Sequence, residues 1–420
     1  MQNCFRTNSA AVLFGFILLC FGLTGCSSDA QAVNDAEVNL GNGVSYQLIG
    51  TYDQDRLNKI GTTELQEFKT TKTDLTLAPA RNAVKLYRVS YRTVIPEWEN
   101  RPVAVTGLIA VSDQAAASYP PISYQHGTVL SRNEVPSFPD QSMETRVMIA
   151  QFAGQGYIVI AADYIGKGSS GATVPDSYMV KESTVQACYD MLVASRAVLA
   201  DLKLTPGDLF LSGWSQGAWS TMQFRYRLES LGIPVKAAAT ASTPTDLYTQ
   251  ITRWINKRTP LDADWIVGTA ALLINSYEHY YDMPGLSYTA FKPLYRQTAV
   301  DLYENRIDWA AASKVFPKSL AELFQDDFVA ASSLMSNAFY KKAHENQAYQ
   351  WRYKTPCRYY YGKADEAIAP YIATLPVEYQ ETVGGAAATA VFAGDQADHR
   401  GTFIFGVLDQ KTWFDSLAGR

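Results

Sequence analysis

The sequence predicts an α/β protein, with a mostly parallel sheet flanked by helices. Apolar residues make up 47% of the 420 residues and charged residues 18%, a balance that is typical of a globular chain with a large core. Beyond residue 84, short β-rich runs alternate with helical stretches, which is the order that a parallel sheet requires. The later runs are almost continuously apolar, as strands covered on both faces are.

Eight strands are expected in this sheet. The first two lie close together in the chain and predict an antiparallel start, whereas longer segments separate the others. The expected strands are residues 85–94, 103–111, 121–125, 157–163, 208–213, 235–241, 357–361 and 389–393. Helices are expected at residues 182–202 and 217–231, and the second helix ends before Gly232 and Pro234.

Residues 245–354 interrupt this alternation. The segment contains no convincing strand, has the pattern of helices and is rich in aromatic residues. Because a structureless loop of this length is uncommon in a compact domain, the sequence predicts a helical cap between the sixth and seventh strands. The sheet domain then comprises residues 46–244 and 355–420. Ligands bind at the carboxyl edge of parallel strands, so we expect the cap to cover the site there.

The first 25 residues predict an export signal. Arg6 is the only charged side chain before Asp29, and it precedes an apolar run at residues 10–23. That run is too short to cross a ~30 Å hydrocarbon layer comfortably, which favours a signal-peptide core. An ordinary cleaved signal and an uncleaved anchor stay open as alternatives to the more specific interpretation that follows.

The signal ends in the sequence LTGC at residues 23–26, which resembles the lipobox of bacterial lipoproteins. The resemblance implies cleavage before Cys26, acylation of that residue, and an exported protein anchored to a membrane by lipid. Ser27 directly after the cysteine resembles the pattern of outer-membrane lipoproteins in two-membrane bacteria. Residues 26–45 are polar and are expected to form a flexible tether.

Charge excludes one class of partner. The chain has 36 basic and 41 acidic residues, a net charge of -5, and no long basic run. Nucleic-acid-binding proteins need a basic surface, so no nucleic-acid partner is expected.

The pentapeptide GWSQG at residues 213–217 predicts the nucleophile. It matches the pattern G-x-S-x-G and lies where an expected strand leads directly into an expected helix. In that setting the pattern predicts a nucleophile elbow, a tight turn that exposes the serine hydroxyl. The two glycines are needed because side chains at those positions would collide with the neighbouring strand and helix. We therefore predict Ser215 as the nucleophile.

A serine nucleophile needs a base to accept its proton. The chain has four histidines. His279 and His344 fall inside the predicted cap, and His126 belongs to a different motif. His399 lies on the loop after the last expected strand, so we predict it as the base.

The base needs a carboxylate to orient it. Asp365 follows the seventh expected strand, at a position from which its side chain can face the active-site edge. Glu366, Asp395 and Asp398 stay open as alternatives, although neighbouring side chains such as those of Asp398 and His399 rarely meet with hydrogen-bond geometry. We predict Asp365 as the acid.

Attack on a carbonyl places negative charge on its oxygen, which backbone N–H groups must stabilise. One predicted donor is Gln216, directly after the nucleophile. The second is Thr128, in the sequence YQHGT at residues 124–128, where Gly127 allows the backbone to come close to the site. We expect His126 to brace this loop rather than to ionise.

With Ser215, Asp365 and His399 in this order, the chain resembles the α/β-hydrolase superfamily over roughly residues 85–415. The motifs YQHGT and GWSQG, the long helical insertion and the late Asp and His are similar to the secretory lipase family of fungal and bacterial esterases. The resemblance implies a serine carboxylic ester hydrolase that acts on a small-molecule or lipid ester with an apolar acyl group. It also implies an acyl-serine intermediate and no metal or organic cofactor.

Two other features are interpreted as structural. Cys188 and Cys357 lie on elements that are far apart in this fold, so we predict two buried free thiols rather than a disulfide. The glycine-rich residues 166–171 lack the spacing of a phosphate-binding loop and are expected to form a turn at the sheet edge.

Three other functions stay open from the residues alone. A peptidase or amidase could use the same triad, and so could an acyltransferase with an acceptor other than water. A surface lipoprotein that only binds a component of the cell envelope would need none of the five predicted site residues, which makes it the least favoured.

Overall fold

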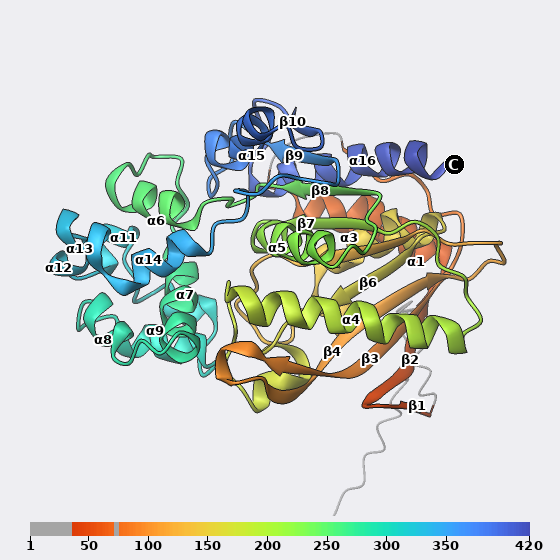
Figure 1. Cartoon of the computed structure of the whole chain (residues 1–420), viewed down its shortest axis with the longest axis horizontal. Helices are drawn as coiled ribbons and strands as arrows, with labels where there is room; N and C mark the ends of the chain where they lie inside the picture. The colour runs from red at the N-terminus through yellow and green to blue at the C-terminus, as the bar shows by residue number, and fades with distance from the viewer. Residues whose placement is uncertain (1–35, 71–74) are drawn as a thin grey trace, which may run out of the picture.

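Ten strands form a single sheet in the computed structural model of this chain, which describes residues 36–70 and 75–420 (Figure 1). The strands are β1 (Val38–Gly41), β2 (Val44–Tyr52), β3 (Val84–Ile95), β4 (Arg101–Ser112), β5 (Pro121–Gln125), β6 (Ile158–Ala162), β7 (Phe210–Trp214), β8 (Ala237–Ala241), β9 (Cys357–Tyr361) and β10 (Ala388–Phe392). Their order is β1-β2-β3-β4-β6-β5-β7-β8-β9-β10. Strands β1 to β4 pair antiparallel, β4 pairs antiparallel with β6, and the remaining pairs are parallel. The predicted mostly parallel α/β sheet is confirmed.

The predicted number of eight strands is wrong, because β1 and β2 add to the antiparallel edge. The prediction of a tether over residues 26–45 is wrong for its last part, since β1 and the start of β2 fall within it. β2 pairs along β3, with Tyr46 opposite Val89. Tyr46 is buried, and its hydroxyl donates to Asp201 at 2.6 Å. Strand pairing orders the last part of this polar segment, which is itself largely exposed, and local composition does not reveal that pairing.

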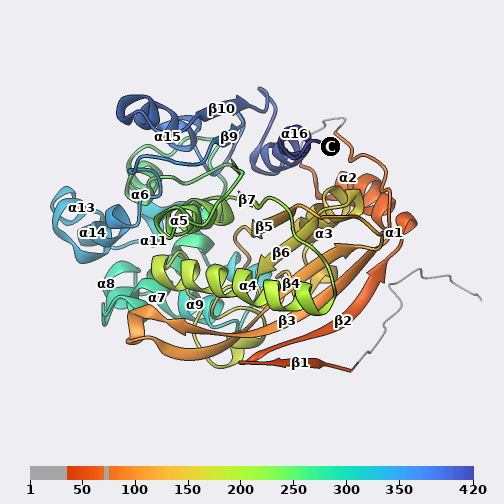
Figure 2. The ribbon, with the colours of Figure 1, turned by 45° about the vertical axis from the view of Figure 1, so that its right-hand side comes forward.

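Helices cover both faces of the sheet (Figure 2). Side chains alternate along β6, so that Ile158 and Ile160 belong to the core on one face and Val159 and Ala161 to the core on the other. Helices α4 (Lys181–Asp201) and α5 (Gln216–Ser230) pack on the first face, and α3 (Met143–Gln151) and α16 (His399–Ala418) on the second. The central strands β5 to β8 are therefore buried on both faces, as their apolar sequences predict. The edge strands β1 and β10 are largely exposed.

Further helices lie on the path of the chain around this sheet. They are α1 (Gln54–Lys59), a π-helical turn (Ile60–Glu64) and α2 (Leu65–Phe68) before β3, and α15 (Pro370–Val383) between β9 and β10.

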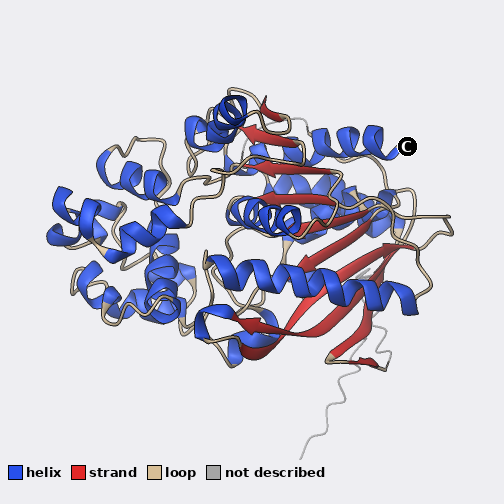
Figure 3. Cartoon of the chain, viewed as in Figure 1, coloured by secondary structure: helices blue, strands red, loops and turns tan. Residues whose placement is uncertain are grey.

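Helices fill the segment between β8 and β9. They are α6 (Leu247–Asn256), α7 (Ile266–Tyr280), α8 (Leu286–Ala290), α9 (Arg296–Tyr303), α10 (Trp309–Ala312), α11 (Leu320–Leu323), α12 (Asp326–Val329), α13 (Ala331–Ser336) and α14 (Ala338–Glu345). Residues 245–354 contain no strand, as predicted, and only one isolated bridge, between Phe291 and Phe324. Figures 1 and 3 show these helices beyond the ends of β7 and β8.

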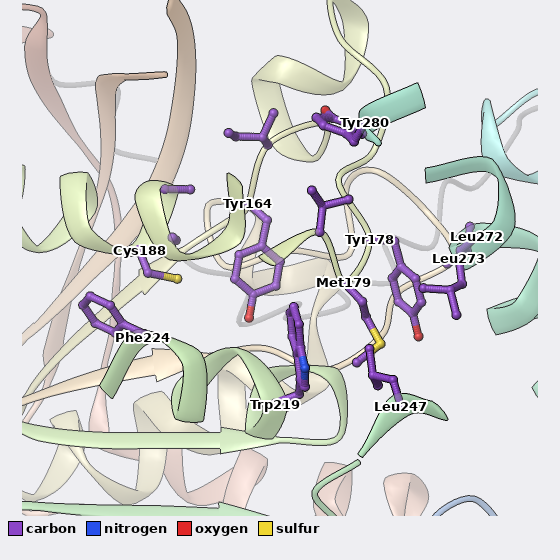
Figure 4. Close-up of a cluster of buried hydrophobic side chains, with 14 of the residues drawn as sticks. Tyr164, Tyr178, Met179, Cys188, Trp219, Phe224, Leu247, Leu272, Leu273 and Tyr280 are labelled. Carbon is purple, nitrogen blue, oxygen red and sulfur yellow. The ribbon is translucent and has the colours of Figure 1, made fainter. Parts of the chain in front are cut away.

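Cys188 on α4 and Cys357 on β9 are buried free cysteines, as predicted. Burial raises the pKa of both thiols. Figure 4 shows Cys188 within the core, in the same cluster as Tyr164 and Phe224.

The predicted signal at residues 1–25 and the acylation site Cys26 lie outside the described residues. Among those that are described, no helix is both long and apolar enough to span a bilayer.

Candidate active site

The loops that carry the predicted site residues leave the carboxyl ends of parallel strands. Thr128 lies just after β5, Ser215 directly follows β7, Asp365 follows β9 and His399 follows β10. β5 pairs with β7, and β7, β8, β9 and β10 are successive neighbours. The topology therefore brings residues that are up to 271 positions apart to one edge of the sheet.

Ser215 lies on a strained turn between β7 and α5. Its backbone has φ 58° and ψ -123°, a conformation that residues other than glycine rarely adopt. A Cβ atom at Gly217 would lie 1.9 Å from the carbonyl oxygen of Gln125, and one at Gly213 would lie 2.3 Å from that of Gly217. Only glycine fits at these two positions, as the sequence predicts for a nucleophile elbow.

Asp365 and His399 form a buried hydrogen-bonded pair. The Nδ1 atom of His399 lies 3.0 Å and 3.2 Å from the two carboxylate oxygens of Asp365. The hydroxyl of Ser242, directly after β8, donates to Oδ2 of Asp365 at 2.6 Å, and the N–H groups of Ala367 and Ile368 donate to Oδ1 at 2.9 Å each. The carboxylate is thus fixed by donors from two neighbouring loops.

The pair shifts the pKa of both partners. Burial alone would raise the pKa of Asp365, but His399 and the other donors outweigh it and hold that pKa below its ordinary value of 3.8. Burial alone would lower the pKa of His399, but the Asp365 carboxylate outweighs it and raises that pKa above 6.5. Each residue therefore stabilises the charged form of the other.

The other three carboxylates considered as acids have different partners. Glu366 accepts from the backbone N–H of His399 at 2.9 Å, Asp395 pairs with Lys363, and Asp398 caps the N-terminus of α16. Within the described chain, Asp365 is the carboxylate that contacts the imidazole ring.

Thr128 and Gln216 lie beside Ser215, and all three line one cavity. Within residues 36–70 and 75–420, neither the N–H of Thr128 nor that of Gln216 donates to a protein acceptor. Both N–H groups are therefore available to a ligand. Gln216 is the first residue of α5, where the helix dipole also favours negative charge.

His126 lies under this loop. Its Nδ1 atom is 2.8 Å from the carbonyl oxygen of Gly127, its Nε2 atom is 3.2 Å from that of Asp163, and its ring stacks on Tyr164. Burial lowers the pKa of His126 to about 4, so the ring is neutral near pH 7. These contacts match a bracing role.

Two cavities meet at Ser215. The first lies between the sheet edge and the insertion. Its apolar lining includes Met179, Leu247, Ile251, Trp254, Trp265, Leu273, Ile274, Leu320, Phe324 and Phe339. Figure 4 shows Met179 and Tyr178 beside Leu247 and Leu273, where core and insertion meet. The second cavity also contains Ser215 and His399, and its wall includes Thr70, Trp214, Trp309, Glu366 and Arg400.

Sequence reasoning missed several contributors to this site. Ser242 holds Asp365, and the indole N–H of Trp214 donates to the carbonyl oxygen of His399 at 3.1 Å. Glu144 on α3 accepts from the N–H of Gly127 at 2.7 Å. Ser242 and Glu144 belong to no recognisable catalytic pattern, although Ser242 at the end of an apolar strand run offered a positional signal. Trp214 lies within the GWSQG motif, but the motif gives no indication of its hydrogen bond to His399. No group of three His, Cys, Asp or Glu side chains in the described residues is placed to hold a metal ion.

The fold is shared with solved structures. No protein-family model and no curated protein matches the chain. A protein of Legionella pneumophila that is assigned as a hydrolase superposes with a TM-score of 0.78 and 20% identity, over 91% of this chain and 98% of that one. The rice cell wall degrading esterase LipA of Xanthomonas oryzae superposes with a TM-score of 0.73 and 19% identity, over 92% and 97% of the two chains.

Candida antarctica lipase A in its closed state superposes with a TM-score of 0.62 and 18% identity, over 80% of this chain and 78% of that one. At these identities the likeness establishes the fold and leaves the activity to be argued from the site. The chain therefore has the α/β-hydrolase fold and resembles the esterases and lipases that share it, as its sequence predicts.

Proposed function

We propose that this protein is a serine carboxylic ester hydrolase that acts on esters with an apolar acyl group. The observation that carries the proposal is the buried Asp365–His399 pair at the same cavity as Ser215, whose strained turn presents its hydroxyl. Asp365 occupies Nδ1 of the imidazole, which leaves Nε2 to act on the serine. The structural neighbours named as esterases and a lipase support the same class of reaction.

The reaction would run in two steps. The hydroxyl oxygen of Ser215 attacks the ester carbonyl while Nε2 of His399 takes the hydroxyl proton, and the carbonyl oxygen becomes negatively charged. The N–H groups of Thr128 and Gln216 stabilise that oxyanion. The intermediate collapses as the carbon–oxygen bond to the alcohol breaks, and the alcohol leaves with the proton from His399. Water then attacks the acyl-serine by the same route and releases the carboxylic acid.

The two cavities suggest where the parts of the substrate bind. The apolar cavity between core and insertion would hold the acyl group, because its lining offers apolar surface and few hydrogen-bond partners. The second cavity has aromatic and polar groups, among them Trp309 and Arg400, and would receive the alcohol.

The test is turnover of p-nitrophenyl esters from acetate to palmitate by the purified protein. We expect hydrolysis at some chain length, and a loss of kcat on the order of 10⁶-fold in Ser215→Ala. Ser230→Ala, at the exposed end of the same helix, is the matched control and should keep wild-type kcat. Absence of turnover for every ester, or full activity in Ser215→Ala, would contradict the proposal.

Three experiments distinguish an esterase from the alternative functions. Matched ester and anilide substrates distinguish an esterase from an amidase, and product analysis with added alcohols detects acyl transfer. A fluorophosphonate probe tests for a non-catalytic binding protein, which would give no adduct at Ser215 in the folded state.

We also infer that the protein is exported and anchored to the outer membrane through lipid on Cys26. The short apolar run at residues 10–23 and the LTGC sequence support this inference. Cys26→Ser should abolish incorporation of radiolabelled palmitate and release the protein from the membrane fraction. Cys188→Ser is the control and should change neither result.

A further inference from the structure

The loop that carries Thr128 is held by a buried acid from the helix layer. We propose that Glu144 is a positioning residue, which fixes this loop so that the Thr128 N–H faces the carbonyl of the substrate. The inference rests on the proposed esterase function, and assigns a role to a side chain that makes no contact with the reacting atoms in the mechanism above.

Glu144 binds the backbone of the loop directly. Its Oε1 atom accepts from the N–H of Gly127 at 2.7 Å and from the hydroxyl of Tyr124 on β5. Glu144 is itself only 6% exposed, and it lies in the first turn of α3, whose N-terminus is capped by the side chain of Ser142. The N–H of Gly127 is therefore committed to α3, which leaves the next N–H, that of Thr128, for the cavity.

Packing sets how close this loop comes to the nucleophile. A Cβ atom at Gly127 would lie 3.2 Å from Oε2 of Glu144 on one side, and 3.2 Å from Cε3 and 3.3 Å from the carbonyl oxygen of Trp214 on the other. Trp214 directly precedes Ser215, and its indole holds the backbone of His399. Glu144 thus binds a loop that packs closely against Trp214, the residue before Ser215. A shift of the Glu144 carboxylate would therefore also shift the N–H of Thr128.

The remainder of the loop is held separately. The hydroxyl of Thr128 lies 2.8 Å from that of Tyr178, and the carbonyl oxygen of Val129 accepts from Nζ of Lys167 at 3.1 Å. Lys167 is in turn paired with Asp176 at 3.0 Å, and both side chains are almost fully buried. These contacts give the glycine-rich residues 166–171 a structural role, and they mean that loss of Glu144 should misplace the loop without unfolding it.

Glu144 does not need to be charged to hold the loop, because the contact depends on its Oε1 atom as a hydrogen-bond acceptor. Burial raises the pKa of Glu144 to about 7, although the hydrogen bonds from Tyr124 and Gly127 and the attraction of His399 act to lower that pKa. In both protonation states Oε1 can accept the Gly127 N–H. A neutral amide of the same length, as in Glu144→Gln, should therefore preserve the position of the loop.

The experiment compares Glu144→Leu, Glu144→Asp and Glu144→Gln with wild type for kcat and KM on the best p-nitrophenyl ester, and for the rate at which a fluorophosphonate labels Ser215. We expect Glu144→Leu to lower kcat and the labelling rate on the order of 10–100-fold with KM within about twofold, because loss of an oxyanion-hole donor costs on the order of 10²–10³-fold. Glu144→Asp, one methylene shorter, should lose part of kcat, and Glu144→Gln should stay within about threefold of wild type.

Gln151→Met is the matched control, since Gln151 is a buried polar residue on the same helix whose side chain makes no hydrogen bond to the loop within the described residues. It should keep wild-type kcat.

Wild-type kcat in Glu144→Leu or, if that variant does not fold, in Glu144→Asp would overturn the inference. A loss of kcat in Glu144→Gln as large as that in Glu144→Leu would also overturn it, because the effect would then come from the charge of Glu144 and not from the hydrogen bond to the loop. The labelling rate separates the two proposals. If wild type labels at Ser215 and Glu144→Leu labels equally fast, only this inference fails, whereas a wild type that does not label contradicts the proposed esterase function itself.

Discussion

At the residue scale, the site depends on one buried pair. Asp365 was predicted from its place after a strand, and the structure places it against His399 with three further donors around its carboxylate. Ser242 supplies one of those donors from the adjacent strand end, which explains why Asp365, rather than the neighbouring Glu366, meets the ring.

The Asp365–His399 pair predicts the pH dependence of the proposed ester hydrolysis. In that reaction His399 must be neutral to take the proton of Ser215, and Asp365 raises the pKa of His399 above 6.5. Activity should therefore be absent at low pH and should rise as the pH increases through a midpoint above 6.5. The profile of kcat/KM against pH, measured with a p-nitrophenyl ester, checks this.

Asp365→Asn removes the carboxylate that raises this pKa. The acid limb of the profile should move to lower pH, and kcat at its plateau should fall on the order of 10⁴-fold because the imidazolium is no longer stabilised. A midpoint that stays in place in Asp365→Asn would show that Asp365 does not set the pKa of His399.

At the element scale, the turn from β7 into α5 is tightly constrained by its backbone and by its neighbours. Its pattern could be predicted from the sequence because a motif of five residues contains both the strained Ser215 and the two glycines, Gly213 and Gly217, that leave no room for a side chain. The atom that Gly217 approaches most closely belongs to Gln125 on β5 and is revealed only by the structure. The strands β1 and β2, by contrast, form by pairing along β3, which lies further along the chain. They were not expected because the local sequence does not show which strands will pair.

Gly217→Ala tests the constraint on this turn. The added methyl would lie 1.9 Å from the carbonyl oxygen of Gln125, so the helix or the loop must move. We expect the free energy of unfolding to fall by about 2–3 kcal/mol or more, as overpacking of a core does. Urea denaturation measures it, and Gly154→Ala is the control because its nearest neighbours lie at an ordinary 3.4 Å. Equal losses in the two variants would refute the explanation.

At the scale of the whole molecule, the apolar cavity belongs to neither core nor insertion alone. Ser215 and Gln216 form its floor, and Leu247, Leu273 and Phe339 come from the insertion. The insertion was predicted from the missing strands, but its helices approach the sheet edge only through tertiary packing, so the shape of the cavity could not be predicted.

Leu273→Trp tests the role of this cavity. The larger ring should fill part of the space and shift the best p-nitrophenyl substrate toward shorter acyl chains by lowering kcat/KM for the longer ones. Leu273→Met conserves volume and should keep the wild-type preference. A chain-length profile that is unchanged in Leu273→Trp would place the acyl group elsewhere.

The fold class, the helical insertion, the turn at Ser215 and the chain order of Ser215, Asp365 and His399 could all be predicted from the sequence, because they depend on periodicity and on short motifs at strand ends. The contact of Glu144 with the loop of Thr128 and the addition of β1 and β2 to the sheet became visible only in the folded chain. The physical reason is that such contacts join segments distant in the chain. Their free energy comes from packing and hydrogen bonds between those segments, which form only as the chain folds. The local sequence does not show which distant segment each side chain will meet.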